Sequence, residues 1–179
     1  MHPATEKLIH ELKDLAIEAV ACDYAQRGYH YEIEIEGKQI RSLAECLLKH
    51  EMYLVFVGGL HVKPACRVIY QFASFERPCR IVIRAVVDEE CQIPTISDIF
   101  DGADWHERET RDFYGIVFSD HPYLKPLILA EEDVDLKPLL KKEADLKEMG
   151  EVSWAPASAA APKSEAPKPE AKKEKTEQG

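Results

Sequence analysis

Seven ionisable side chains lie within residues 104–112, a density that suits catalysis, metal binding or recognition of a charged partner. Two pairs of opposite charge are four residues apart, Glu107 with Arg111 and Arg108 with Asp112, so they can support a helix through its own ion pairs. Such a helix most often faces solvent. Fixed guanidinium and carboxylate groups also suit docking to a protein of complementary charge.

Two enzymatic alternatives use the same stretch. Glu109 and Asp112 could form a general acid–base pair, although nothing in the sequence supplies a pocket for them. Glu109, Asp112 and His121 could instead bind the metal ion of a small metal-dependent enzyme. His106 does not begin a zinc-binding H-E-x-x-H motif, because Thr110 occupies the final position.

The remaining residues give no sign of a cofactor bound by this chain. The five cysteines show no C-x-x-C spacing, so we expect reduced, mostly buried thiols and no zinc or iron–sulfur site. They are Cys22, Cys46, Cys66, Cys79 and Cys91. No glycine-rich loop follows an expected strand, which argues against a dinucleotide site or a phosphate-binding loop.

The composition narrows the class of partner. The 179 residues include 23 Lys and Arg against 33 Asp and Glu, a net charge of -10 that argues against binding nucleic acid through bulk charge. No apolar run reaches the roughly 18 to 20 residues of a membrane span. The first residues mix acids and bases without an apolar signal core, so we expect the chain to stay where it is made.

Hydrophobic periodicity predicts the elements that position these side chains. Apolar residues at steps of three and four predict a helix over residues 6–20, and strict alternation predicts a strand over 29–36. Capping-box spacing from Ser42 predicts a helix over 43–50. Further strands are expected over 53–57, where Gly58 and Gly59 end the run, and over the hairpin 66–75 and 79–87. The sequence thus predicts an α+β fold, a mainly antiparallel sheet with helices on one face.

The charged stretch itself is expected to form a helix over residues 105–114, begun by the Asp104-x-x-Glu107 spacing and ended by a left-handed Gly115. Thr95 or Ser97 is expected to cap a short helix before it, through residue 100. Residues 116–118 read as extended, and the prolines that follow prevent another helix, which leaves an extended carboxyl-terminal arm.

The last part of the chain has a different composition. Residues 155–179 contain no large apolar side chain and are rich in Ala, Pro, Lys and Glu. Such a segment cannot bury enough surface to offset its ordering entropy. We therefore divide the chain into a folded domain, 1–150, and a disordered tail, 151–179.

Specific spacing links the charged stretch to a known family. Glu107, Arg108 and Glu109 are followed, after two positions, by an acid and two bulky apolar residues, then by a histidine, a basic residue and two aliphatic residues: Asp112, Phe113, Tyr114, His121, Lys125, Leu127 and Ile128. This pattern resembles the C subunit of NADH–quinone oxidoreductase, respiratory complex I, and related membrane-bound hydrogenase subunits. The resemblance covers roughly residues 6–142 and is strongest in the last third.

The resemblance implies a non-catalytic subunit of the peripheral arm, on the cytoplasmic side of the cell membrane. It implies that iron–sulfur clusters and quinone belong to partners, the large hydrogenase-like quinone-chamber subunit and the terminal iron–sulfur subunit. Electron transfer in such complexes is coupled to proton translocation. A nickel–iron hydrogenase complex and a free adaptor remain alternatives. The expected interface comprises Trp105, Glu107, Arg108, Glu109, Arg111, Asp112, His121, Pro122 and Lys125.

Overall fold

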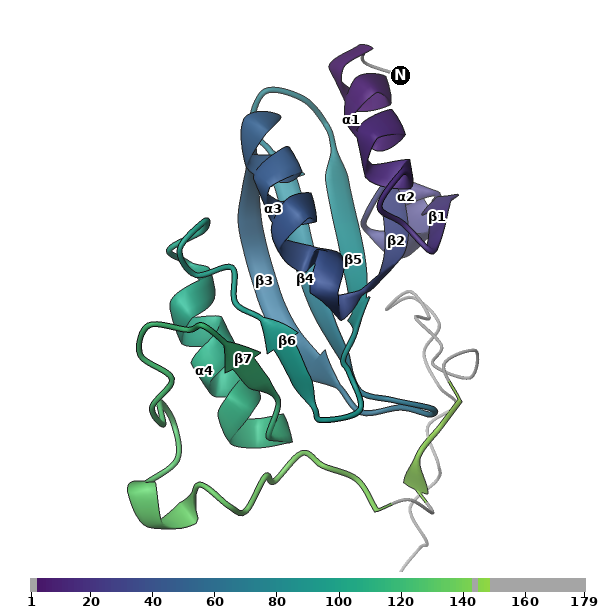
Figure 1. Ribbon diagram of the computed structural model, residues 1–179. Helices are drawn as coiled ribbons and strands as arrows, with labels where there is room; N and C mark the ends of the chain where they lie inside the picture. Colours follow the sequence, from purple (N-terminus) through teal and green to yellow (C-terminus); the bar gives the residue numbers. More distant parts are fainter. Residues whose placement is uncertain (1–2, 143–144, 149–179) are drawn as a thin grey trace, which may run out of the picture.

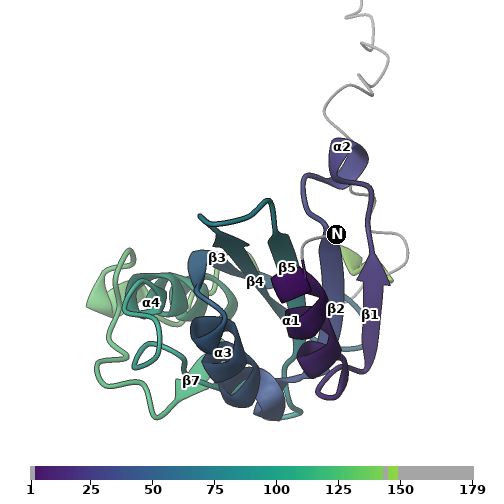
Figure 2. The ribbon, with the colours of Figure 1, turned by 90° about the horizontal axis from the view of Figure 1, so that it is seen from above.

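The structure, a computed structural model, describes residues 3–142 and 145–148. Two helices, α1 (Pro3–Lys13) and α3 (Ile40–Lys49), lie side by side on one face of a five-stranded sheet (Figures 1 and 2). Their leucines, Leu8 and Leu12 on α1 and Leu43 and Leu47 on α3, are buried in the main core. The predicted α+β class with helices on one face is therefore confirmed.

The sheet has the strand order β1-β2-β5-β4-β3. Its strands are β1 (Glu18–Ala21), β2 (Tyr31–Glu36), β3 (Met52–Leu60), β4 (Arg67–Ser74) and β5 (Arg80–Val86). Neighbours pair antiparallel except β2 and β5, which are parallel. The predicted β4–β5 hairpin and the mainly antiparallel character of the sheet are confirmed, and β5 lies at its centre.

The alternating pattern of β2 is confirmed from Tyr31 onward, although the strand begins two residues later than expected and Tyr29 packs in a separate cluster with Ile69 and Val82. Tyr31, Ile33 and Ile35 are buried, whereas the glutamates between them point to the other face of the sheet. That face of the sheet is not fully exposed to solvent. Glu32 lies 2.6 Å from Arg84 Nη1 of β5, so side chains of a neighbouring strand partly cover the acidic positions.

The first predicted helix ends earlier than expected. Residues 6–20 were expected to be helical throughout, but α1 stops at Lys13 and residues 18–21 form the edge strand β1. The N–H of Ile17 donates to the Glu34 carbonyl at 2.8 Å, and β1 pairs with β2 beyond it. Pairing with β2 supplies the backbone partners that a longer helix would have supplied locally.

The expected end of β3 at Gly58 and Gly59 is also wrong. The strand continues to Leu60 and is crossed there by α4 (Ala103–Tyr114). A Cβ atom on Gly59 would lie 2.4 Å from Tyr114 Cδ2, so the missing side chain is what lets the helix approach the strand. Gly59 therefore serves close packing between α4 and β3.

The elements around α4 are short. β6 (Gln92–Pro94) and β7 (Val117–Ser119) form a parallel pair, in agreement with the extended segment expected over 116–118. Gly115 ends α4 with φ of 71°, as predicted. The helix expected through residue 100 is only a turn, in which the N–H of Phe100 donates to the Ile96 carbonyl at 2.8 Å.

Both expected capping boxes, at Ser42 and at Asp104, are wrong. The residues at the N-caps of α3 and α4 are Gln39 and Gly102, and neither makes a side-chain capping bond. Three short helical turns were not predicted: α2 (Tyr24–Arg27), η1 (Gly37–Gln39) and η2 (Glu131–Asp133). The side chain of Asp23 caps the first of these by accepting from the N–H of Ala25 at 3.0 Å.

After β7 the chain runs as an irregular arm, which Figure 1 shows passing beneath α4 and back toward the sheet. Lys63, in the β3–β4 connection, forms an isolated bridge with Glu148. No helix among residues 3–142 and 145–148 has the length and apolar character needed to cross a bilayer. The predicted tail, 151–179, lies outside the described residues, so the domain boundary at 150 stays a prediction.

Candidate functional site

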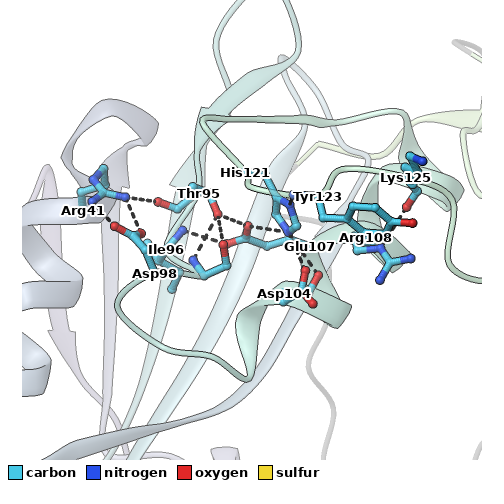
Figure 3. Close-up of polar contacts among 11 residues, drawn as sticks. Arg41, Thr95, Ile96, Asp98, Asp104, Glu107, Arg108, His121, Tyr123 and Lys125 are labelled. Atoms are coloured by element: carbon cyan, nitrogen blue, oxygen red, sulfur yellow. Dashed lines mark hydrogen bonds and ion pairs between the residues drawn. The ribbon is translucent and has the colours of Figure 1, made fainter.

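Glu107 has a fully buried side chain that holds α4 against the loop formed by residues 95–98. Its Oε1 accepts a hydrogen bond from the backbone N–H of Ile96 at 2.9 Å. Its Oε2 accepts a hydrogen bond from the Thr95 hydroxyl, which lies 2.8 Å from the hydroxyl of Ser97 (Figure 3). The first glutamate of the sequence motif is thus a structural link inside the chain.

The same loop is also fixed to α3. Arg41 donates from Nη1 to the Thr95 carbonyl at 2.8 Å. Its two terminal nitrogens also donate to the two carboxylate oxygens of Asp98, each at 2.7 Å. A two-point contact of this kind fixes orientation as well as distance. The 95–98 loop therefore sits between α3 and α4, and Figure 3 shows both connections.

The environment of Glu107 favours its protonated form. Burial raises its pKa to about 7, although the bonds from Ile96 and Thr95 favour the charged form. The nearby carboxylates of Asp104 and Asp98 contribute to the rise. Near neutral pH the carboxyl group is therefore poised between its two protonation states.

His121 lies next to the carboxylates of Asp104 and Glu107. Its side chain is fully buried, with Nε2 3.1 Å from Asp104 Oδ1 and 3.8 Å from Glu107 Oε2. Its Nδ1 accepts a hydrogen bond from the backbone N–H of Tyr123 at 3.0 Å. We assign the ring proton to Nε2 on that basis, because an accepting nitrogen carries none. His121 thus joins α4 to the segment 121–129, which we call the strap.

Asp112 holds the end of the strap. Its side chain is fully buried, and its Oδ2 accepts hydrogen bonds from the backbone N–H groups of Leu127, Ile128 and Leu129 at 2.8, 2.9 and 3.2 Å. Burial alone would raise the pKa of Asp112. The three N–H groups and the Arg111 guanidinium outweigh it, so the pKa lies below its ordinary value and the group stays ionised.

Arg108 holds the middle of the strap, one helical turn before Asp112. Its Nε donates to the Lys125 carbonyl at 2.9 Å and its Nη2 to the Pro126 carbonyl at 3.0 Å. Its guanidinium also lies over the ring of Tyr123, 5.1 Å from the centroid (Figure 3). Arg108 binds carbonyls and Asp112 binds N–H groups, so together they fix both kinds of backbone group in the strap.

The residues expected to contact a partner therefore differ in their exposure, and four of them, Arg108, Glu109, Arg111 and His121, are intermediate. Glu107 and Asp112 are buried and bound within the chain, so the geometry does not present them to a partner's basic groups as the sequence suggested. The expected ion pairs within α4, Glu107 with Arg111 and Arg108 with Asp112, are replaced by contacts to the loop and the strap. The exposed members of the predicted interface are Trp105, Pro122 and Lys125.

Large apolar side chains gather at this exposed surface. Trp105 on α4 is 67% exposed, and Tyr123 and Ile128 on the strap are 53% and 58% exposed. Trp105 lies one turn before Arg108, whose guanidinium covers Tyr123, so the helix and the strap form one face. We call Trp105, Pro122, Tyr123, Lys125 and Ile128 the α4–strap face. Exposed tryptophan and tyrosine side chains beside an arginine are typical of protein-binding surfaces.

Two charged members of the predicted set lie beside this face. Glu109 is partly exposed, 3.9 Å from His106 Nδ1, and Arg111 is partly buried, with Nη1 3.4 Å from Asp112 Oδ1. Sequence reasoning missed Arg41, Thr95 and Tyr123. The Thr95-x-Ser97 spacing was the available signal, but it indicated a helix cap and instead marks the binding site of a buried glutamate.

The enzymatic alternatives lose their geometric basis. Asp112 is not available to a reacting group, since three N–H groups occupy its Oδ2 in a fully buried position. Within residues 3–142 and 145–148, Glu109, Asp112 and His121 do not form a group with metal-binding spacing. The arrangement holds backbone segments in place and leaves an aromatic surface outside.

Comparison with known sequences identifies the family of the chain. Residues 33–148 match the family described as respiratory-chain NADH dehydrogenase, 30 Kd subunit. The C subunit of the NADH-quinone oxidoreductase of Paramagnetospirillum magneticum is 38% identical over 102 residues, 57% of this chain and 51% of that protein. The corresponding subunit of Mesorhizobium japonicum is 46% identical over 61 residues, 34% of this chain and 30% of that protein. The chain thus spans about half or less of the length of these curated relatives.

Two solved structures share the fold. A trypsin-resistant fragment of Nqo5 superposes with a TM-score of 0.57 at 22% identity, covering 68% of this chain and 99% of the fragment. A chain of the membrane-bound sulfane sulfur reductase, an archaeal respiratory membrane complex, gives a TM-score of 0.62 at 18% identity, covering 75% of this chain and 82% of that one. Because the family match covers more than half of the sequence, the chain belongs to the 30 Kd subunit family of respiratory-chain NADH dehydrogenases.

Proposed function

We propose that this chain is a non-catalytic subunit of the peripheral arm of a complex I-like NADH–quinone oxidoreductase. It binds the large hydrogenase-like quinone-chamber subunit, next to the terminal iron–sulfur subunit, on the cytoplasmic side of the membrane. The iron–sulfur clusters and the quinone belong to those partners. Electron transfer and its coupling to proton translocation take place in the assembly, and this chain stabilises the assembly.

The proposal rests on the contacts that the charged residues of the family motif make within the chain. Its charged residues hold the 95–98 loop and the strap, and the product is a rigid exposed surface, the α4–strap face. Arg108 and Asp112 bind five backbone groups of the strap between them. A preorganised surface loses little conformational entropy when it binds, which favours a stable subunit contact.

Replacement of Trp105 tests the proposal. In the native complex, purified in mild detergent through an affinity tag on this chain, Trp105→Ala should reduce the recovered large and iron–sulfur subunits at least about tenfold. Loss of an aromatic anchor at the centre of an interface costs about 2 kcal/mol or more. Tyr123→Ala should act in the same direction.

Phe75→Ala is the matched control. Phe75 is 83% exposed and follows β4, at the end of the sheet opposite to the part of β3 that α4 crosses. Its replacement should leave partner recovery unchanged. Full recovery of partners with Trp105→Ala and Tyr123→Ala would refute the proposed docking surface. Intact assembly with lost quinone reduction would point to a direct redox role, and nickel in the purified complex would identify a hydrogenase-type assembly.

A further inference from the structure

A second cluster of ligand-type side chains lies away from α4, where α1 meets α3. Glu11 comes from α1, Cys46 from α3, and His50 from the position that ends α3. Among the described residues this is the trio whose possible ligand atoms, a carboxylate oxygen, a thiol sulfur and an imidazole nitrogen, all lie within 4.8 Å of one another. Neither the family motif nor the α4–strap face uses any of the three.

The spacing follows from the helix. Cys46 and His50 are four residues apart, so both side chains lie on one face of α3. The N–H of His50 still donates to the Cys46 carbonyl at 3.2 Å, which keeps the last turn helical. The carbonyl of His50 accepts a hydrogen bond from the buried Arg77 at 3.0 Å. The backbone beneath both ligands is therefore fixed without a metal ion.

Two of the three distances between the possible ligand atoms suit a tetrahedral ion, and the third, from Cys46 to His50, is within 4.8 Å. His50 Nε2 lies 3.1 Å from Glu11 Oε2, and Cys46 Sγ lies 3.6 Å from the same oxygen. Around a tetrahedral zinc ion with ordinary bond lengths, nitrogen and oxygen ligands are about 3.4 Å apart and sulfur and oxygen ligands about 3.6 Å apart. The side chains of His50 and Glu11 are 10% and 30% exposed, so the cluster is accessible from solvent at its edge.

We propose that Glu11, Cys46 and His50 form a zinc-binding site, with water as the fourth ligand, that fastens α1 to α3. On binding, the Cys46 thiol gives its proton to solvent and a Zn–S bond forms, while Glu11 binds as carboxylate and His50 as neutral imidazole. Thiolate, imidazole and carboxylate are the ligands that zinc takes in proteins, and a site with three protein ligands keeps one position open.

Two neighbouring features set the conditions for binding. Burial and the adjacent Glu11 carboxylate raise the pKa of Cys46 to about 11, so without metal the thiol keeps its proton, and zinc must displace it. Lys49 Nζ lies 3.6 Å from Glu11 Oε2 and competes for that oxygen. The Lys49 side chain is 69% exposed and can turn away into water when the metal binds.

Calorimetric titration of Zn²⁺ into the metal-free full-length chain, with its tag removed, tests the site. The expected result is one equivalent bound and a raised unfolding temperature. The Co²⁺-loaded protein should show the intense visible bands of tetrahedral cobalt and a sulfur-to-metal charge-transfer band. Cys46→Ser should abolish the charge-transfer band and weaken Zn²⁺ binding at least about tenfold, the lower end of the cost of disturbing even an outer contact of a metal site.

Glu11→Gln and His50→Gln should weaken binding to a similar extent, and circular dichroism establishes that each variant is folded. Two matched controls should bind as the unchanged chain does: Cys22→Ser, which removes another partly exposed thiol, and His10→Gln, which removes the exposed histidine next to Glu11. Absence of stoichiometric zinc binding overturns the proposal. So does equal affinity in Cys46→Ser and Cys22→Ser, or a cobalt spectrum without the sulfur band.

Discussion

Asp112→Asn probes the contact that fixes the end of the strap. The carboxylate oxygen Oδ2 receives the N–H groups of Leu127, Ile128 and Leu129. A hydrogen bond to a charged group contributes about 1.5–3 kcal/mol, roughly twice the value for a neutral partner. Asparagine keeps an oxygen of the same shape but loses the charge. Since bonds that share one acceptor are not additive, we expect the strap to lose about 2–4 kcal/mol of local stability.

Hydrogen exchange at the three backbone N–H groups measures this loss directly. If the strap opens locally, about 2–4 kcal/mol corresponds to roughly 30- to 700-fold faster exchange at residues 127–129. Amides in the core strands should keep their protection. Asp133→Asn, at an exposed acid farther along the arm, serves as the charge-matched control and should leave the three rates unchanged. Unaltered exchange at 127–129 in Asp112→Asn would refute the assignment of Asp112 as the residue that holds the strap.

Two further substitutions test the packing of α4. Folding raises the pKa of Glu107 from 4.5 to about 7, so between these pH values the folded chain keeps a proton that the unfolded chain releases. As pH rises from 4.5 to 7, the free energy of unfolding should therefore fall by up to about 3 kcal/mol because of this group. Glu107→Gln should remove that decline in urea denaturation across the pH range, and a parallel decline in the variant would contradict the assignment. Gly59→Ala should cost about 1–3 kcal/mol, because its Cβ would lie 2.4 Å from Tyr114 Cδ2. Gly102→Ala, where a Cβ meets nothing within 4 Å, is the control for the same urea measurement, and equal losses would show that close packing is not the cause.

Most helices and strands were predictable because the spacing of their apolar side chains along the sequence indicates the secondary structure. Alternation in β2 and the apolar runs of β4 and β5 correctly gave strands, and the left-handed Gly115 correctly ended α4. The end of α1 was not predictable from periodicity. Residues 15–20 continue a helical spacing. Residues 18–21 form an edge strand only because they pair with β2, and the position of β2 in turn depends on its pairing with β5.

The charged stretch was predictable as a helix, but the contacts of its side chains were not. Charges over 104–112 suggested a solvated helix, yet Glu107 and Asp112 are buried, since their donors are mainly backbone N–H groups that composition does not reveal. A signal was present in the stripe of Ala103, Glu107 and Thr110, which share one helical face and are all buried. Two small residues flanking a glutamate on one face indicate close packing around it.

The central position of β5 has a consequence for synthesis. β2 pairs on its inner edge with a strand that begins at Arg80, and β4 also needs β5 on its second edge. While the ribosome is still making the residues before Arg80, α1 and β2 have no completed sheet on which to bury their apolar faces. The amino-terminal part of the chain therefore keeps unpaired strand edges until β5 has been translated. If an incomplete chain were released from the ribosome before that point, these edges could pair with other chains.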